Sequence, residues 1–196
     1  MIADHRAATC AVLVLAAGGS RRLGRPKQLV RRHGRALVVH ALEAAVAVRP
    51  LWVGVVLGAR AGRVAAELGS RDVTVVLNRR WRQGLALSLR AGLRKVPRSA
   101  SHVLVMTVDQ WQVTACDLAQ LLKARARVPV AAAYADTVGV PAVFPRRYWR
   151  LLASLDGDRG ARELLNAPST LRVPLPRAAE DLDRPDDLAR MRAMGG

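Results

Sequence analysis

Cysteine, aromatic residues, acidic residues and long apolar runs are all scarce in this chain, and each scarcity excludes a class of protein. The two cysteines, Cys10 and Cys116, lie far apart and form no C-x-x-C pair, which argues against a disulfide framework or a cysteine-ligated metal. We expect both thiols to be buried and reduced, as in a cytoplasmic protein. No uncharged apolar run approaches the roughly 18 residues that a transmembrane helix needs, so we expect no membrane span.

Acidic residues are outnumbered by basic ones, 15 to 32, and the formal net charge is +17. Nearly all the cations are arginine, and they are scattered along the chain instead of forming one stripe or tail. Only 4% of the residues are aromatic, and the four tryptophans do not form a spaced platform for stacking bases. These features argue against a basic nucleic-acid-binding protein, which stays the alternative from a different functional class. The positive field of the chain instead favours a small anionic substrate.

The chain does contain a regular alternation of apolar and amphipathic segments, in which hydrophobic residues make up 51% of the total. Buried strands are predicted at residues 10–16, 51–57, 73–77, 102–109, 128–134, 138–144 and 170–173. Helices are predicted at residues 36–48, 60–69, 85–95, 114–127, 146–155 and 157–166, with a last helix that has Asp186 and Asp187 in its first turn. Repeated strand and helix steps favour right-handed crossovers and a mostly parallel sheet with helices on both faces. We expect an α/β fold, a single-domain Rossmann-like three-layer sandwich over residues 1–196, with residues 1–8 as a flexible N-terminal tail.

A glycine-rich, cationic loop follows the first strand, and residues 15–27 read L-A-A-G-G-S-R-R-L-G-R-P-K. Small residues allow several backbone N–H groups to turn toward one phosphate, and Arg22 and Lys27 can neutralise its charge. The spacing from Gly19 to Gly24 is that of a P-loop, but Arg and Pro follow where Lys and Ser or Thr are required. A dinucleotide fingerprint is excluded as well, because Pro26 interrupts the helix that should start there. The loop therefore predicts a nucleotide triphosphate site of another kind.

A secretory signal is a rival interpretation of the same N-terminal segment. His5 and Arg6 precede a short apolar run that ends in the small residues Ala16, Ala17 and Gly18. The basic region also contains an aspartate, and the apolar run has the length of a core strand. We therefore favour the strand.

The loop resembles the L-A-A-G-x-S-x-R-h-G-x-x-K signature of the MobA-like nucleotidyltransferases, and its Ala-Ala form is most similar to the molybdenum cofactor cytidylyltransferase branch. The positions that match are Leu15, Ala16, Ala17, Gly18, Ser20, Arg22, Gly24 and Lys27. The resemblance implies a fold of the nucleotide-diphospho-sugar transferase type. It also implies that residues 15–20, Gly19 included, bind the nucleotide and that Arg22 and Lys27 stabilise its phosphates during catalysis.

A second segment resembles the family motif N…W-x-x-G-x-x-x-S-L-x-x-G-L, which lies beside the nucleotide base. Its members here are Asn78, Trp81, Gly84, Ser88, Leu89, Gly92 and Leu93. Asn78 and Ser88 are short polar groups that can hydrogen-bond a base or ribose, although locally they also fit capping and turn chemistry. We expect Trp81 to serve packing rather than stacking.

Two acidic segments carry the predicted metal site. Asp109 ends an apolar strand and begins a D-Q-W sequence that resembles the family's D-Q-P metal motif, with Trp111 in place of Pro. Asp183 matches the metal ligand of the family's D-I-D-T-P-E-D-L motif, with Arg184 in place of Thr. The resemblance implies that Asp109 and Asp183 hold Mg²⁺ and that Asp109 is catalytic. The local alternatives are a turn cap at Asp109 and a helix cap at residues 186–187.

Two further segments resemble family motifs that border the acceptor substrate. Residues 139–144 match G-x-P-x-x-F with Gly139 and Pro141, and residues 157–162 match G-D-x-G-A-R. A helix start that carries arginines suits an anionic acceptor, although helix capping explains residues 157–162 equally well. For residues 138–144 the alternative is a glycine and a proline that shape a hairpin with residues 128–134 or an edge strand. The candidate acceptor contacts are Gly139, Pro141, Asp158, Arg159, Arg162 and Asp181.

The chemistry that the resemblance implies is transfer of CMP from CTP to the phosphate of molybdopterin, with release of pyrophosphate. Delivery of the product to a molybdenum hydroxylase is the implied partnership. The preference for CTP over GTP depends on Ala16 and Ala17, where guanylyl transferases carry Gly-Gly. The main alternative is a related nucleotidyltransferase that acts on another phosphorylated small molecule as acceptor, or that uses GTP as the nucleotide donor. We expect a cytoplasmic enzyme without a membrane segment.

Overall fold

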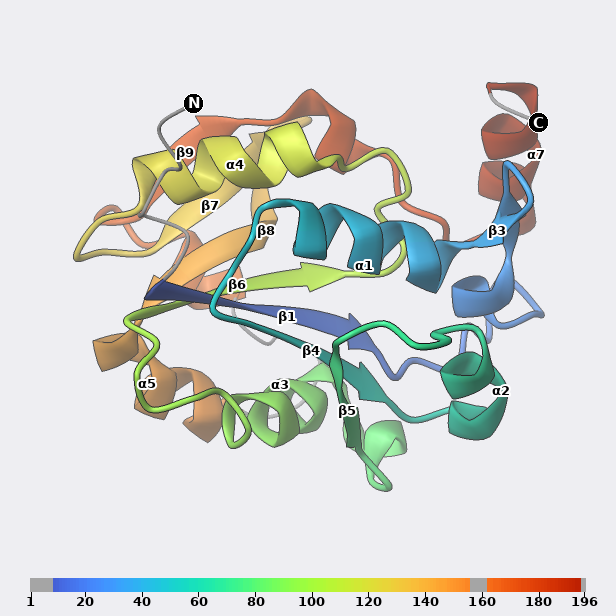
Figure 1. The fold of residues 1–196 in the computed structure, drawn as a ribbon. Helices are drawn as coiled ribbons and strands as arrows, with labels where there is room; N and C mark the ends of the chain where they lie inside the picture. The colour runs from blue at the N-terminus through green and yellow to red at the C-terminus, as the bar shows by residue number, and fades with distance from the viewer. Residues whose placement is uncertain (1–8, 156–161, 195–196) are drawn as a thin grey trace.

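The computed structural model describes residues 9–155 and 162–194, so the predicted N-terminal tail lies outside the described residues. A seven-stranded sheet forms the centre of the molecule, in the order β5-β4-β1-β6-β8-β7-β9 (Figure 1). Its strands are β1 (Cys10–Ala16), β4 (Trp52–Leu57), β5 (Thr74–Leu77), β6 (His102–Thr107), β7 (Val130–Tyr134), β8 (Thr137–Pro145) and β9 (Leu171–Pro174). β8 runs antiparallel to both β6 and β7, and the other paired strands of this sheet are parallel. The predicted α/β fold with a mostly parallel sheet is confirmed.

Helices cover both faces of the sheet, and the sheet separates two apolar cores (Figure 1). One face carries α1 (Leu37–Ala47) and α4 (Ala115–Ala124), and the other carries α3 (Leu85–Leu93) and α5 (Trp149–Ser154). All seven residues of β1 are buried, which explains its continuous apolar sequence. Val12 and Val14 belong to the first core, whereas Leu13 and Leu15 belong to the second, as the alternation of a strand requires.

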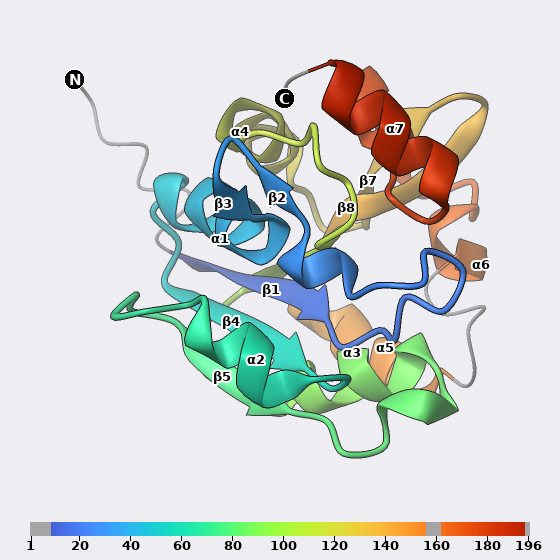
Figure 2. The same ribbon diagram turned by 90° about the vertical axis from the view of Figure 1, so that its right-hand side faces the viewer.

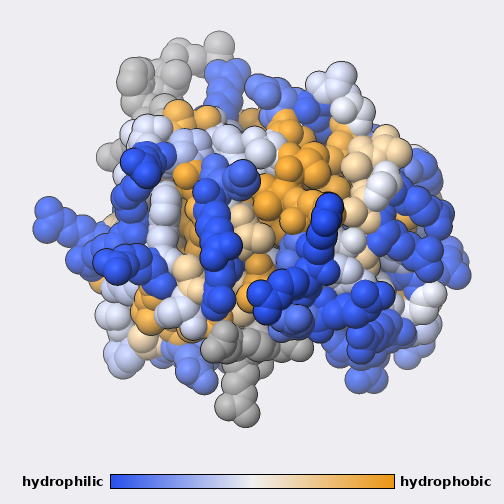
Figure 3. All heavy atoms as spheres, turned by 90° about the horizontal axis from the view of Figure 1, so that it is seen from below, coloured by the Kyte–Doolittle hydropathy of each residue, from blue (hydrophilic) through white to orange (hydrophobic). Residues whose placement is uncertain are grey.

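The remaining helices are short or lie near the ends of the strands. They are α2 (Ala61–Ala66), α6 (Arg162–Leu165) and α7 (Pro185–Ala193), with the 3₁₀ turns η2 (Lys27–Leu29), η3 (Trp81–Gln83), η4 (Arg146–Tyr148) and η5 (Pro176–Ala179). Hydrophilic side chains spread over the α3 and α5 side of the molecule and leave an apolar area between them (Figure 3). On this side the hydrophilic surface is not confined to a single stripe (Figure 3).

A small hairpin was not predicted from the sequence. β2 (Arg31–Arg32) and β3 (Arg35–Ala36) pair in antiparallel fashion around His33 and Gly34, whose φ values are 47° and 75°. Two consecutive positive φ values are those of a type I′ turn, for which glycine is the natural second residue. Strands of two residues carry no hydrophobic alternation, so sequence patterns do not reveal them.

The hairpin of β7 and β8 was predicted, but the alternative of an edge strand for residues 138–144 is wrong. β8 lies between β6 and β7, and β9 forms the edge. A proline is tolerated inside the sheet because the ladder between β7 and β8 has a bulge: Ala131 pairs with Ala142 and Ala132 with Gly139, so Pro141 is skipped.

Two further expectations concern the cysteines and the membrane. Cys10 is buried, and burial raises the pKa of its thiol to about 12. Cys116 is exposed in the first turn of α4, so the expectation that both thiols are buried is wrong for this residue. Within residues 9–155 and 162–194, every helix is too short or too polar to cross a membrane.

Candidate active site

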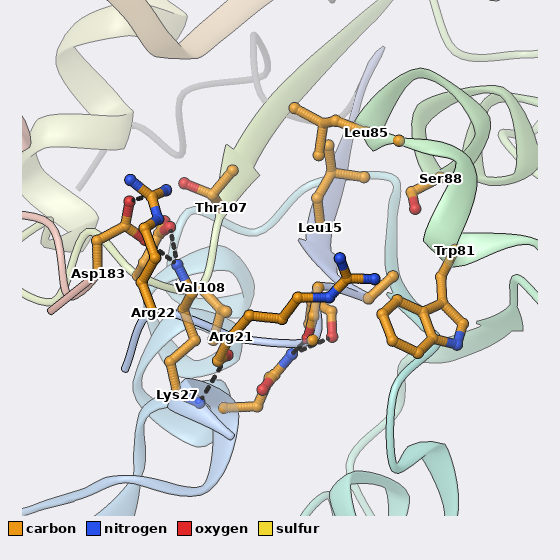
Figure 4. A pocket seen from close by; sticks show the side chains of 18 of the residues that line it. Leu15, Arg21, Arg22, Lys27, Trp81, Leu85, Ser88, Thr107, Val108 and Asp183 are labelled. Atoms are coloured by element: carbon orange, nitrogen blue, oxygen red, sulfur yellow. Dashed lines mark hydrogen bonds and ion pairs between the residues drawn. The ribbon is translucent and has the colours of Figure 1, made fainter. Parts of the chain in front are cut away.

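A cavity of about 530 Å³ opens where β1 and β6 end. Figure 2 views the molecule from the side on which these strands end, and Figure 4 shows the cavity at close range. Carboxyl ends of parallel strands are the usual place for ligands in open α/β sheets. The cavity is lined by Leu15, Ala16, Ala17, Gly18, Gly19, Ser20, Arg21, Arg22, Lys27, Gln28, Trp81, Arg82, Gly84, Leu85, Ser88, Thr107, Val108, Asp109 and Asp183.

The predicted phosphate loop forms one wall of this cavity, and its glycines have different surroundings. A methyl group on Gly18 would meet nothing within 4 Å, whereas one on Gly19 would lie 2.8 Å from Cζ3 of Trp81. The hydroxyl of Ser20 accepts a hydrogen bond from the backbone N–H of Lys27 at 3.0 Å, which closes the loop on itself. Gly19 is therefore required by the packing of the opposite wall, and Ser20 by the shape of the loop.

Gln28 anchors the loop from behind, a role that the sequence did not reveal. Its side chain is 1% exposed, and its Nε2 donates to the carbonyl oxygens of Ala16 and Gly18, both at 2.8 Å. Its Oε1 is buried and has no hydrogen-bond partner among the described residues. The amide thus fixes two carbonyl oxygens of the loop. Because these bonds use none of the loop's backbone N–H groups, those groups stay available to other partners.

Lys27 joins the two predicted metal-binding carboxylates. Its Nζ lies 2.7 Å from Oδ2 of Asp109 and 2.6 Å from Oδ1 of Asp183, and the lysine side chain is only 12% exposed. Burial lowers the pKa of Lys27, but the negative charges of Asp109 and Asp183 more than offset burial and raise that pKa above its ordinary value. Arg22 approaches the other oxygen of Asp183 at 2.6 Å from a mostly exposed position. The two carboxylates, the lysine and Arg22 therefore form one network at one side of the cavity. Figure 4 labels Arg22, Lys27 and Asp183 of this network.

Backbone contacts explain why Asp183 reaches a carboxylate 74 positions earlier in the chain. The N–H of Leu182 donates to the carbonyl oxygen of Asp109 at 3.1 Å, and Leu182 itself is fully buried. Asp187 then begins α7 by accepting the N–H groups of Asp183 and Arg184, at 2.9 and 2.7 Å. The predicted helix cap by the residue pair 186–187 is thus seen at Asp187, which holds the segment that carries Asp183.

The carboxylate pair suits a hard divalent cation. Carboxylate oxygens are the ligands that Mg²⁺ prefers, and this ion usually takes only one or two of them and completes its shell with water and phosphate. No group of three or more His, Cys, Asp or Glu side chains able to hold a metal occurs in the described part of the chain. Burial and the negative charges of Asp109 and Asp183 raise the pKa of Asp181, so a further carboxylate lies within electrostatic range.

The opposite wall of the cavity comes from η3 and α3. Trp81, Leu85 and Ser88 line it (Figure 4). The guanidinium of Arg82 lies over the indole of Trp81, 4.6 Å from the ring centroid. Ser88 is 2% exposed and receives a 3.0 Å hydrogen bond from Nδ2 of Asn78. Asn78 is not among the lining residues, so it acts on the cavity through Ser88. Trp81 packs against the loop, as expected, and also presents a surface to the cavity.

Some predicted acceptor residues lie away from this cavity. Gly139 and Pro141 belong to β8 and are not lining residues. Asp158 and Arg159 fall outside the described residues, as does the side chain of Arg162, which starts α6. A role for these positions toward an acceptor stays a prediction.

Sequence reasoning missed two cations that line the cavity, Arg21 and Arg82. Arg21 extends across the cavity toward Trp81 (Figure 4), and no hydrogen bond or ion pair holds its guanidinium among the described residues. Arg21 occupies an unspecified position of the family signature, between the matching residues Ser20 and Arg22, so the resemblance did not single it out. Its place inside the cationic loop was the signal that could have identified it.

Comparison with known proteins extends the geometric evidence. A model of the MobA-like NTP transferase domain matches residues 12–173. The chain belongs to the MobA-like NTP transferase family. Nicotine blue oxidoreductase of Paenarthrobacter nicotinovorans is 31% identical over 163 residues, which cover 78% of this chain and 79% of that protein.

Solved structures agree with this assignment. The crystal structure of Rv0371c from Mycobacterium tuberculosis H37Rv superposes with a TM-score of 0.85 at 31% identity and covers 94% of this chain and 97% of its own. A complex of Rv0371C from the same strain with manganese has a TM-score of 0.80 at 28% identity, covering 93% and 97%. The MobA-like chain thus shares its fold over nearly its whole length with proteins whose identity to it approaches one third.

The arrangement in this MobA-like protein can grip a polyphosphate between two walls. The loop offers backbone N–H groups and the cations Arg21, Arg22 and Lys27, and the opposite wall offers an indole and a buried hydroxyl. Asp109 and Asp183 offer oxygen ligands beside the same cations.

Proposed function

We propose that this MobA-like nucleotidyltransferase transfers CMP from CTP to the phosphate of molybdopterin, with Mg²⁺ held by Asp109 and Asp183. The observation that carries the proposal is the convergence of those two carboxylates on Nζ of Lys27 at the edge of the glycine loop. A cation network of this kind matches the charges of a triphosphate and its metal. Support for CTP comes from Ala16 and Ala17, and support for molybdopterin comes from the loop resemblance alone. The proposal includes cytoplasmic activity and transfer of the product to a molybdenum hydroxylase.

The proposed reaction is an in-line displacement at the α-phosphorus. An oxygen of the acceptor phosphate attacks, the bond to the β-phosphate bridging oxygen breaks, and pyrophosphate leaves. When bound, Mg²⁺ would neutralise phosphate oxygens as a Lewis acid. Lys27 and Arg22 would bind the triphosphate and stabilise charge on its oxygens, and the loop amides would orient it. The attacking group is the acceptor phosphate itself, so the reaction needs no nucleophile from the protein.

When the nucleotide binds, Lys27 and Arg22 can exchange their carboxylate partners for phosphate oxygens. Lys27 and Arg22 occupy oxygens of Asp109 and Asp183. A triphosphate offers these cations equivalent anionic oxygens, so they can turn toward it when the carboxylates take a metal. Arg21 already extends over the cavity and provides a third phosphate contact.

The test measures pyrophosphate release from each of the four nucleoside triphosphates, with Mg²⁺ and molybdopterin as acceptor. We expect release with CTP, and we expect Asp109→Asn to lower it by about a hundredfold or more, as loss of a preorganised charge contact does. Asp136→Asn, in the exposed turn between β7 and β8, is the matched control and should keep full activity. Full activity of Asp109→Asn would contradict the metal assignment, and release with GTP alone would move the protein to the guanylyl branch.

An oxidoreductase is the second candidate, because a relative at 31% identity carries that name. The same phosphate loop can hold the pyrophosphate of a nicotinamide dinucleotide, since backbone N–H groups do not distinguish the two ligands. Oxidation of NADH or NADPH by the purified protein in the presence of an electron acceptor, without release of pyrophosphate from any triphosphate, would favour this candidate.

A further inference from the structure

A second hollow lies at the opposite end of β6 from the catalytic cavity. We call this cavity the basic hollow. It has a volume of about 580 Å³, and its lining residues are His102, Lys123, Arg125, Ala126, Arg127, Pro145 and Arg147. His102 begins β6 and Thr107 ends it beside the catalytic cavity, so the two cavities are separated by the length of that strand, roughly 17 Å. In Figure 1 the arrowhead of β6 marks the end of the strand opposite to its start at His102.

The basic hollow contains cations without carboxylates. Four of its seven lining residues are lysine or arginine, and none is acidic. Within the described residues, Lys123 and Arg127 have neither a hydrogen bond nor an ion pair, and Arg147 contacts only the ring of Tyr148, at 5.3 Å. Four like charges around one concavity repel one another, and a bound anion would remove this repulsion.

Ordinary helix capping explains only one of these cations. α4 ends at Ala124, and Arg125 donates from its guanidinium to the carbonyl oxygen of Leu122 at 3.0 Å, as expected for a cation at a helix C-terminus. Lys123 and Arg127 make no such contact. Their side chains are exposed beside the hollow and available to a ligand.

Another arginine-rich hollow serves as a comparison, because it is smaller and one of its arginines is ion-paired. It is lined in part by Arg25, Arg31, Arg63 and Arg192 and has less than half the volume, about 240 Å³. There Arg31 forms a 2.9 Å ion pair with Glu67. Within the described residues, by contrast, no lysine or arginine of the basic hollow forms an ion pair with a carboxylate.

The shape of the basic hollow selects the class of ligand. Its volume falls within the range of small-molecule sites, roughly 300 to 1,000 Å³. Single-stranded nucleic acids instead need a groove that follows several nucleotides and aromatic rings on which bases stack. We propose that the basic hollow binds a small polyphosphate anion, whether an inorganic polyphosphate or the triphosphate tail of a free nucleotide. This site is separate from the catalytic cavity and does not depend on the proposed reaction.

His102 provides a local reporter. Its ring lies in the hollow, with Nε2 3.1 Å from the carbonyl oxygen of Ala126. Burial lowers the pKa of His102, and the positive charge of Arg125 lowers it further. An anion bound beside Arg125 cancels that repulsion, so its binding should raise the pKa of His102 while the ring signals of His33 and His40 stay unchanged.

The experiment is a calorimetric titration of the full-length protein with tripolyphosphate in low salt without divalent metal. We expect one binding event in the catalytic cavity and a second in the basic hollow. Lys123→Gln/Arg127→Gln should weaken the second event by about tenfold or more, because both lost contacts are charge-assisted. Arg63→Gln/Arg192→Gln removes the same charge from the other arginine-rich hollow and should keep both events. Arg147→Gln, on a different chain segment, is an independent second variant that should also weaken the second event.

Nuclear magnetic resonance of the histidine rings assigns each event to its place. The second event should shift the His102 signals in the wild type and the Arg63→Gln/Arg192→Gln control, and CTP should shift them as tripolyphosphate does. A single event in the wild type, or equal weakening in both double variants, would overturn the site. A short single-stranded RNA that binds more tightly through Lys123 and Arg127 would replace it with a nucleic-acid interface.

Discussion

A methyl group added at Gly19 should destabilise the protein, whereas the same methyl at Gly18 should not. The ideal Cβ at Gly19 would lie 2.8 Å from Cζ3 and 3.0 Å from Cη2 of Trp81. Ordinary carbon contacts begin near 3.5 Å, so the indole would have to retreat by about 0.7 Å. The Cβ at Gly18 would meet nothing within 4 Å.

The magnitude follows from this overlap. Overpacking of a formed contact costs about 1 to 3 kcal/mol, and a chain of this length loses about 2 to 4 °C of melting temperature per kcal/mol. Gly19→Ala should therefore lower Tm by about 2 to 12 °C. Gly18→Ala should change stability by no more than about 0.5 kcal/mol, as for a surface substitution. It should still impair nucleotide binding, because its methyl occupies open space beside the proposed phosphate site.

The assay is urea and thermal unfolding of the two variants in the wild-type and Trp81→Leu backgrounds. If the indole is the obstacle, Trp81→Leu should abolish the penalty of Gly19→Ala, with a coupling energy of about 1 kcal/mol or more. Equal destabilisation by Gly18→Ala and Gly19→Ala would refute the reasoning. So would a Gly19→Ala penalty that persists unchanged in the leucine background.

Three other substitutions or probes address the loop, the last helix and the cysteines. Gln28→Leu removes the donor to the carbonyl oxygens of Ala16 and Gly18 and should cost about 1 to 3 kcal/mol in urea unfolding, with a raised KM for the triphosphate. An unchanged KM would leave Gln28 a merely structural residue. Burial raises the pKa of Asp187, but hydrogen bonds from the backbone N–H groups of Asp183 and Arg184 lower that pKa below its ordinary value. The ionised carboxylate therefore stabilises the folded protein above the pKa that Asp187 has in the unfolded chain, and this stabilisation is lost as pH falls through its lower pKa in the folded protein. Asp187→Asn should therefore cost about 1 kcal/mol near neutral pH and progressively less in acid, and a pH-independent difference would contradict the cap. A thiol reagent should modify Cys116 quickly in the folded protein and Cys10 only on unfolding, which mass spectrometry of digested samples will show.

The fold was largely predictable because the buried strands are read directly from apolar runs. β1 and β4 are covered on both faces, so their sequences are continuously hydrophobic and unlike those of the surface helices. The loop after β1 was predictable for a different reason, since its glycines and cations are adjacent in sequence. The helix ends were predicted less well: α3 ends at Leu93 and α4 at Ala124, each short of the predicted boundary. Helix ends depend on local hydrogen bonds that residue patterns do not fix.

The contacts between distant segments were not predictable from residue patterns. That Gln28 turns back to hold the carbonyls of Ala16 and Gly18 depends on the 3₁₀ turn η2, which carries no hydrophobic period. The exposure of Cys116 depends on which side of α4 faces the sheet. A free cysteine is usually buried, and that preference misled the expectation.

The relation between the two carboxylates is the consequence of sheet order. β1 and β6 are neighbours in parallel register, with Leu15 opposite Thr107, so the loop that follows β1 and the aspartate that follows β6 must meet. Asp183 joins them only because a buried leucine beside it bonds its N–H to the backbone of Asp109. Lys27 contacts both carboxylates, and so it links the first loop of the sheet, the end of a neighbouring strand and the start of the last helix. Because the three segments have no local tendency to approach one another, the tertiary fold fixes the spacing of these charges, and a change in the packing of α7 should act on the site as directly as a change in the loop.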